Sequence, residues 1–195
     1  MDMDSVSYAL GMMLSQNLKK QGFDEVNPDE LAKGFKEGLA GNAELELASA
    51  NATIQSYLQE KQEAAGAEAR KGGEEFLAEN AKRPEVKVTD SGLQYEVLKE
   101  GTGSRPTATE TVEVHYHGTL IDGTVFDSSV ERGQTIEFPL NRVIPGWTEG
   151  VQLMQEGAKY RFFIPWNLAY GERGSAPKIP PYAALIFDVE LFEVK

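Results

Sequence analysis

The sequence predicts an α+β protein, with an all-helical first part followed by an antiparallel sheet that wraps around one short helix. Two observations predict it. Before about residue 84, apolar residues recur at helical spacing, whereas after it they alternate in short runs broken by Gly and Pro. Between two of these runs, one stretch returns to helical spacing. We therefore expect a helical dimerisation module over residues 1–42, a long linker helix over 43–83 and a second domain over 84–195.

The first helix is predicted from one apolar face that ends near Gly22. Its members, at i, i+4, i+7, i+8 and i+12, are Val6, Leu10, Met13, Leu14 and Leu18. The second helix has a start signal, with Asn27 as N-cap and Pro28 at the first helical position. Its apolar face carries Leu31, Phe35 and Leu39 before Gly41.

Two short helices cannot bury much apolar surface by themselves. We therefore expect the first module to pair with a second copy of the chain. The alternative is that both helices pack against the chain's own C-terminal part.

From Ala43 to about Lys82 the chain has no proline and is rich in strong helix formers. This composition predicts one long, largely solvated helix that acts as a spacer. Three glycines weaken that prediction, at Gly66, Gly72 and Gly73. A set of shorter helices broken at the glycines is the alternative.

Five strand-like runs follow, at residues 93–98, 111–120, 135–138, 159–164 and 184–194. In the second run, alternation places Val112, Val114 and Tyr116 on one face, which we expect to be the core side. After Pro145-Gly146, the spacing of Trp147, Val151 and Met154 predicts one short helix on the sheet.

The composition limits the classes of partner. A formal charge of -12 argues against a nucleic-acid partner, since phosphate binding needs clustered Lys and Arg. The absence of cysteine excludes disulfides and thiolate chemistry. His115 and His117 share one strand face, but no third ligand follows them, so we expect no metal and no cofactor.

No apolar run reaches the about 20 residues that span a bilayer, so we expect no membrane partner. The beginning of the chain at Met1 lacks the basic and then apolar order of a signal peptide. We therefore expect a cytoplasmic protein, or a periplasmic one if a leader has been removed.

Six ordered segments in the second half carry a family resemblance. They are Val114-His-Tyr-His-Gly-Thr-Leu, Asp122-Gly-Thr-Val-Phe-Asp-Ser-Ser, Val143-Ile-Pro-Gly-Trp, Ala169-Tyr-Gly, Ile179-Pro-Pro and Leu185-Ile-Phe-Asp-Val-Glu-Leu. In order and spacing they resemble the FKBP domain over roughly residues 90–195. Together with the helical first half, the chain is similar to the Mip-like bacterial FKBPs, a group of peptidyl-prolyl cis/trans isomerases that dimerise through N-terminal helices.

The resemblance implies the site. The catalytic residues it implies are Tyr116, Phe126, Asp127, Trp147, Tyr170 and Phe187. The substrate-binding residues it implies are Val143, Ile144, Phe138, Ile179 and Ala169. In this family, the indole that corresponds to Trp147 forms the floor under the proline ring.

The resemblance also implies function and partners. We expect an isomerase that acts on X-Pro bonds in unfolded or partly folded polypeptides, with chaperone activity aided by a homodimer. Macrolide inhibitors such as FK506 or rapamycin are expected ligands. A peptide-binding chaperone and a dimeric scaffold with little isomerase activity are the alternatives.

Overall fold

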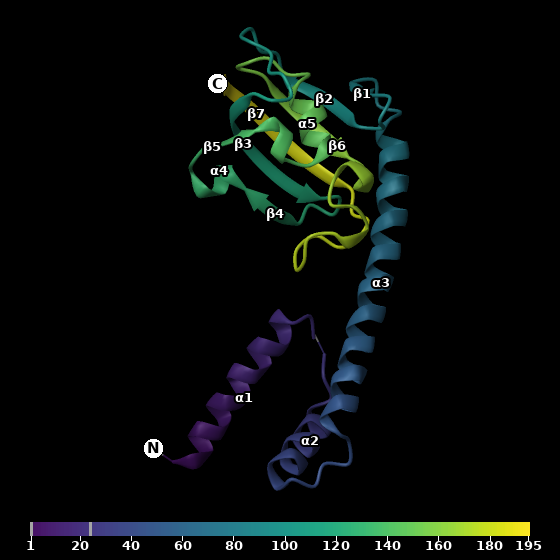
Figure 1. The fold of residues 1–195 in the computed structure, drawn as a ribbon, viewed down its shortest axis with the longest axis vertical. Coiled ribbons are helices and arrows are strands. Elements are labelled where there is room, and N and C mark those ends of the chain that lie inside the picture. Colours follow the sequence, from purple (N-terminus) through teal and green to yellow (C-terminus); the bar gives the residue numbers. More distant parts are fainter. Residues whose placement is uncertain (1, 24) are drawn as a thin grey trace. The chain divides into compact units, whose positions relative to one another are not determined.

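A computed structural model describes residues 2–23 and 25–195, and its chain divides into two compact units. The first unit extends to Lys61 and the second covers Gln62–Lys195. The first is helical and the second contains every strand of the described residues (Figure 1). The α+β class predicted from the sequence is confirmed.

The first unit contains α1 (Met3–Lys20), α2 (Pro28–Ala40) and the beginning of α3 (Leu47–Asn80). The side chain of Asn27 accepts hydrogen bonds from the backbone of Asp29 and Glu30, so the predicted cap of the second helix is confirmed. Gly41 ends the helix in the left-handed conformation, with φ 70°. Neither α1 nor α2 has a buried residue among those described.

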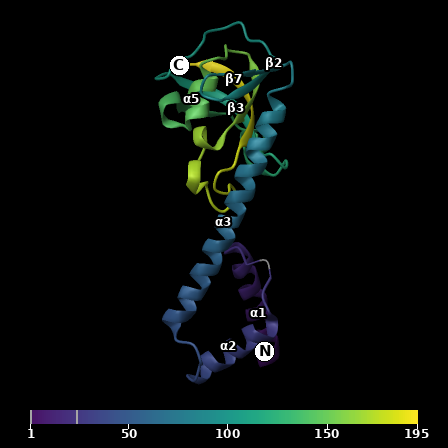
Figure 2. The ribbon, with the colours of Figure 1, turned by 90° about the vertical axis from the view of Figure 1, so that its right-hand side faces the viewer.

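The predicted long helix is confirmed as one continuous element, and the alternative of shorter helices is wrong. Its second half clusters with the sheet, although the sequence-based scheme assigned residues up to 83 to the linker. Three of its residues, Gly66, Gly73 and Asn80, are buried. The upper part of α3 lies beside the sheet in both views (Figures 1 and 2).

The second unit is built on an antiparallel sheet of seven strands in the order β1-β2-β6-β7-β3-β4, with β5 paired to β3. The strands are β1 (Val86–Val88), β2 (Gln94–Lys99), β3 (Thr111–Leu120), β4 (Val125–Ser128), β5 (Ile136–Pro139), β6 (Lys159–Ile164) and β7 (Leu185–Val194). All five predicted strands are confirmed within two residues. The two that the sequence did not predict are β1 and β4, which have three and four residues.

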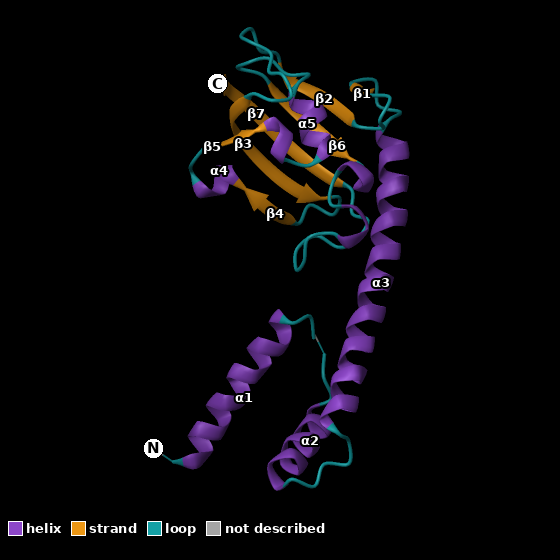
Figure 3. Cartoon of the chain, in the orientation of Figure 1, coloured by secondary structure: helices purple, strands orange, loops and turns teal. Residues whose placement is uncertain are grey.

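The helix α5 (Pro145–Val151) is the short helix that the sequence predicted, and it covers one face of the sheet (Figure 3). Two glycines let it approach closely. A Cβ added at Gly146 would lie 2.5 Å from Ile164, and one at Gly150 would lie 2.7 Å from Phe162. The core therefore forms between α5 and β6, with Trp147 and other aromatic side chains buried against the sheet.

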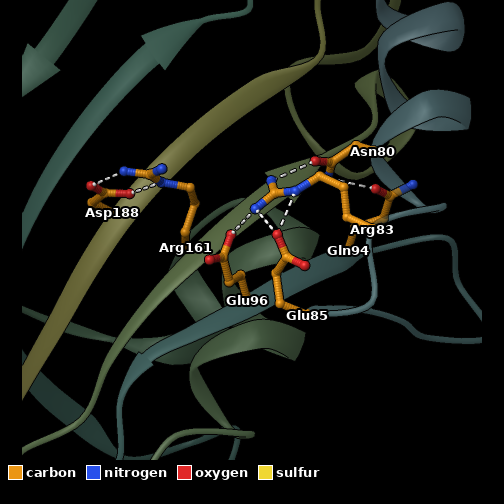
Figure 4. Close-up of polar contacts among 7 residues, drawn as sticks. All are labelled: Asn80, Arg83, Glu85, Gln94, Glu96, Arg161 and Asp188. Carbon is orange, nitrogen blue, oxygen red and sulfur yellow. Dashed lines mark hydrogen bonds and ion pairs between the residues drawn. The ribbon is translucent and has the colours of Figure 1, made fainter.

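Helix α3 ends in a polar junction with β2 (Figure 4). The amide of Asn80 donates to Gln94 at 2.9 Å, and Gln94 in turn donates to the carbonyl of Leu77 at 2.8 Å. Both amide side chains are buried, with 5% of each residue exposed. Arg83 binds Glu85 and Glu96 at 2.6 Å and 2.8 Å. Buried polar groups must be paired, so these contacts fix the end of α3 against the sheet.

None of the helices in residues 2–23 and 25–195 combines the length and the apolar character needed to cross a membrane.

Candidate active site

A pocket of about 760 Å³ opens in the second unit, a volume in the range of small-molecule sites. Its lining comes from β3, β4, β5, β7, the start of α5 and the segment between β6 and β7. Of the residues predicted from the sequence, the lining contains Tyr116, Phe126, Asp127, Phe138, Val143, Ile144, Trp147, Tyr170, Ile179 and Phe187. Ala169 is the exception, since it packs half-buried against the core and does not line the pocket.

Trp147 lies at the centre of an aromatic cluster within the pocket. Its ring is edge-to-face with Tyr116 at 5.4 Å and with Phe187 at 5.2 Å between centroids. Phe138 packs against it at 5.3 Å. Only 3% of Trp147 is exposed, and its indole N–H has no hydrogen-bond partner among the described residues. Such an unpartnered buried donor is costly and is typical of functional sites.

Strand β3 determines where Tyr116 points, because its buried positions alternate as predicted. The ring joins the cluster while the hydroxyl reaches the pocket's polar side. There it donates to Asp127 and accepts from Arg132 at 2.8 Å. Arg132 also forms an ion pair with Asp127. These three side chains form a closed polar triangle beside the aromatic floor.

Burial and the contacts of the triangle shift the pKa values of Asp127, Tyr116 and the nearby Tyr170. Partial burial acts to raise the pKa of Asp127, but hydrogen bonds from Tyr116 and Arg132 outweigh it and hold the pKa below its usual value. Burial raises the pKa of Tyr116, and the hydrogen bond to Asp127 adds to the rise. Burial also raises the pKa of Tyr170, with a further rise from the charge of Asp127. At neutral pH both phenols keep their protons and can donate.

The sequence reasoning did not assign six residues that line the pocket. They are Ile136, Arg142, Ser175, Ala176, Pro177 and Lys178. It also missed Arg132, which holds Tyr116 and Asp127 from the short helix α4 (Ser129–Arg132). A signal for α4 was present, because Ser128 followed by Glu131 three residues later is a capping-box pattern. The Ser128 side chain does accept from the backbone of Glu131.

The two histidines of β3 each contact a serine hydroxyl at 2.9 Å, His115 with Ser129 and His117 with Ser128. In the part of the chain that the structure describes, no three His, Cys, Asp or Glu side chains gather as metal ligands do. The pocket itself is an apolar aromatic cavity with phenol hydroxyls and a paired carboxylate at its edge. Such a cavity suits a small apolar ring joined to a polar carbonyl.

Two family profiles match the chain. The profile described as FKBP-type peptidyl-prolyl cis-trans isomerase matches residues 103–192. The profile described as the domain amino terminal to FKBP-type peptidyl-prolyl isomerase matches residues 3–97. The first match contains all the pocket residues named above.

Similar proteins match almost the whole chain. An FKBP-type peptidyl-prolyl cis-trans isomerase FkpA of Aeromonas hydrophila is 46% identical, over 98% of this chain and 74% of its own length. The FKBP-type 22 kDa peptidyl-prolyl cis-trans isomerase of Escherichia coli is 44% identical, over 96% of this chain and 93% of its own. The crystal structure of FkpA from Escherichia coli has a TM-score of 0.76 at 36% identity, covering 100% of this chain and 97% of that one.

The expectation of a cytoplasmic location is wrong. A relative from Legionella longbeachae that is 42% identical over 100% of this chain is named outer membrane protein MIP. The expectation rested on a missing signal pattern at Met1, a residue outside those that the structure describes. A missing pattern carries no information about the compartment.

Profiles, relatives and fold agree over both halves of the molecule. The chain belongs to the family of FKBP-type peptidyl-prolyl cis-trans isomerases.

Proposed function

We propose that the aromatic pocket is the site at which this isomerase catalyses cis/trans rotation about X-Pro bonds in polypeptides. The observation that carries the proposal is the cluster around Trp147, a buried indole surrounded by Tyr116, Phe138 and Phe187. Its floor is apolar and matches the pyrrolidine ring. Phe126 supports it from the side, edge-to-face with Phe187 at 5.3 Å.

Rotation about an amide bond has a barrier of about 18–20 kcal/mol because resonance must be broken. The twisted transition state has lost resonance, so its carbonyl is less dipolar than that of the planar amide. Transfer into an apolar pocket therefore costs the transition state less than the ground state, which is the requirement for catalysis. Lowering the barrier by about 6 kcal/mol corresponds to roughly four powers of ten in rate.

In this proposal, Trp147, Phe126 and Phe187 hold the proline ring, and Asp127 and Tyr170 guide the carbonyl. Phe138, Val143 and Ile179 contact the substrate from the pocket wall, and the backbone N–H of Ile144 donates to it. All of these residues line the same cavity, which supports the assignment. Ala169 lies next to Tyr170 and outside the lining, so we assign it no contact with the substrate.

The test is a prolyl-isomerisation assay on a short X-Pro peptide with wild type and Trp147→Ala. We expect kcat/KM to fall by at least about tenfold, since the floor of the pocket is lost. The matched control is Phe192→Ala, an aromatic on β7 that is 45% exposed and outside the pocket, which should keep wild-type activity. We also expect FK506 or rapamycin to abolish wild-type activity. Full activity in a folded Trp147→Ala protein contradicts the assignment.

We further propose a homodimer through α1 and α2. Both helices present large apolar side chains that nothing in their own unit covers. They include Leu10, Met13, Phe35 and Leu39, which are 59%, 70%, 61% and 77% exposed. Leu10 and Met13 lie three residues apart and Phe35 and Leu39 four apart, so each pair shares one helix face, and an exposed apolar helix face is typical of protein interfaces.

A chaperone activity is the second function that we propose. A dimer carries two pockets, and joining two weak sites raises the apparent affinity for one unfolded chain. The same apolar helices support this function, because without them the second pocket is lost.

A further inference from the structure

The segment between β6 and β7, residues 165–184, forms one wall of the pocket and is called here the wall segment. It belongs to no strand, yet it supplies six residues of the lining: Tyr170, Ser175, Ala176, Pro177, Lys178 and Ile179. Two short 3-10 turns, Trp166–Leu168 and Gly171–Arg173, and a backbone hydrogen bond of 3.0 Å from Tyr182 to the carbonyl of Gly171 lie within it. Ser175 and Ile179 exchange two backbone hydrogen bonds of 2.8 Å and 2.9 Å, and Lys178 donates to the carbonyl of Phe126 at 2.8 Å. These bonds lie within the segment or join it to β4, so its position relative to α3 depends on its contacts with that helix.

The two ends of the wall segment are joined by a ring contact. Trp166 near its start and Tyr182 near its end lie edge-to-face, with centroids 5.1 Å apart. Tyr182 has φ 58° and is the only non-glycine residue with positive φ among those described. L residues adopt this conformation at an energetic cost, which persists where surrounding contacts demand it. The contact that Tyr182 gains is therefore structurally important.

The guanidinium of Arg70, on α3, contacts the rings of both Trp166 and Tyr182. Its guanidinium carbon lies 5.5 Å from the ring centroid of Trp166 and 5.6 Å from that of Tyr182. Both distances are within the range of cation–π attraction. Glu74, one turn along, forms an ion pair with Arg70 at 3.0 Å. One side chain of the helix therefore contacts both ends of the wall segment.

Glycines on the face of α3 around Arg70 allow the helix to approach the wall segment closely. Gly66 and Gly73 lie at i−4 and i+3 from it, on the same face. A Cβ at Gly66 would lie 3.0 Å from Pro181, and one at Gly73 would lie 3.0 Å from Ala184. The glycines that weaken the helix in the sequence thus allow it to touch the end of the wall segment directly.

The helix can hold the wall only if it is itself fixed to the sheet. The junction of Asn80 and Gln94 provides this anchor three turns further along α3 (Figure 4). Phe76 adds a ring contact with Phe163 of β6 at 5.9 Å between centroids. The part of α3 that carries Arg70 is therefore fixed relative to the strands that carry the aromatic floor.

We propose that Arg70 is a positioning residue of the isomerase: it ties both ends of the wall segment to α3 and so holds Tyr170 and Ile179 at the pocket. The second half of α3 then helps to position the pocket wall, in addition to connecting the catalytic unit to the first unit. The inference rests on the proposed function of the pocket.

The experiment compares wild type, Arg70→Gln, Arg70→Lys and Glu74→Gln in the full chain, well below the unfolding temperature. There the folded fraction is close to one, so a pure loss of stability leaves kcat/KM unchanged. We expect kcat/KM for an X-Pro peptide to fall about threefold to tenfold in Arg70→Gln, the size expected from losing cation–π contacts. Arg70→Lys keeps the charge and should recover part of the loss. Glu74→Gln keeps both ring contacts and should match wild type.

Hydrogen exchange gives a second readout that does not need activity. In Arg70→Gln, the backbone amides of Ser175, Ile179 and Tyr182 should exchange faster, while those of β3 should not change. Wild-type kcat/KM together with wild-type exchange in Arg70→Gln overturns the inference. An equal loss in Glu74→Gln also overturns it, because the ion pair would then be responsible. If wild type itself has no isomerase activity, the proposed function fails, and the exchange comparison alone decides the role of Arg70.

Discussion

Asp127 is the residue whose charge matters most at the pocket edge, because Tyr116 and Arg132 both bind it. Its pKa lies below the ordinary value of 3.8, since these hydrogen bonds outweigh the effect of partial burial. A carboxyl with a lowered pKa in the folded state stabilises the fold above its unfolded pKa. The contribution is lost as pH falls through the folded pKa. The triangle should therefore be intact throughout the neutral range.

This predicts a specific pH dependence for Asp127→Asn. The difference in the free energy of unfolding between wild type and the variant should be constant from about pH 8 to pH 5 and should shrink only below the ordinary value of 3.8. Urea unfolding at a series of pH values measures it. A difference that already disappears between about pH 7 and pH 6 would mean that another group controls the site.

At the residue scale, sequence reasoning succeeded where a local rule applied. Alternation along β3 was enough to place Tyr116 on the core side. The remaining pocket residues were found through the family resemblance, and ten of the eleven line the cavity. Arg132 was missed because its contact with Tyr116 spans 16 residues and depends on the turn of α4. No spacing in the sequence encodes such a contact.

At the scale of the elements, the length of a strand determined whether the sequence predicted it. β3 has ten residues, enough for its alternation to stand out, and its predicted bounds are those observed. β1 and β4 have three and four residues, too few to show a period, and they exist because β2 and β3 pair with them. The sequence therefore gives the long strands, while the short edge strands depend on their partners.

The neighbouring glycines of α3 provide a matched pair. A Cβ at Gly72 would make an ordinary contact of 3.4 Å with the Ile121 side chain, whereas one at Gly73 would lie 3.0 Å from the Cβ of Ala184. Gly72→Ala should stabilise the protein by about 0.4–1 kcal/mol, because Ala restricts the unfolded chain. Gly73→Ala should destabilise it by about 1–2 kcal/mol through overpacking.

Urea unfolding of the two alanine variants checks this pair. The helix propensity gained is the same in both, so the difference between them isolates the contact with the sheet. Equal stabilities would mean that α3 does not press against Ala184, and would weaken the positioning role inferred for Arg70.

At the scale of the whole molecule, the sequence predicted a helical first part, a long helix and a sheet domain, and these are present. It did not predict that α3 belongs half to each unit. The reason is that the docking face of its second half is made largely of Gly66, Arg70, Gly73 and Asn80, with Phe76 as its large apolar contact. A contact made by small and polar residues leaves no hydrophobic period, so the helix resembled a solvated spacer.

This division makes the position of a truncation decisive. Removing residues 1–61 should leave a monomer with wild-type kcat/KM on a short X-Pro peptide, since the pocket, the wall segment and Arg70 all remain. Its ability to help a whole proline-containing protein refold should fall, because the apolar helices and the second pocket are lost. Size-exclusion chromatography, the peptide assay and a refolding assay measure the three properties.

Removing residues 1–83 should lower stability and activity further than removing residues 1–61. It deletes the second half of α3, and with it the hydrogen bond between Asn80 and Gln94, the ring contact of Phe76 with Phe163, and Arg70. The shorter domain should therefore unfold at lower urea and turn over peptides more slowly than the chain that begins at Gln62. If the two truncated proteins are equally stable and equally active, α3 is only a connector. If the longer one alone keeps wild-type activity, the catalytic unit of this isomerase begins within α3, well before its first strand at Val86.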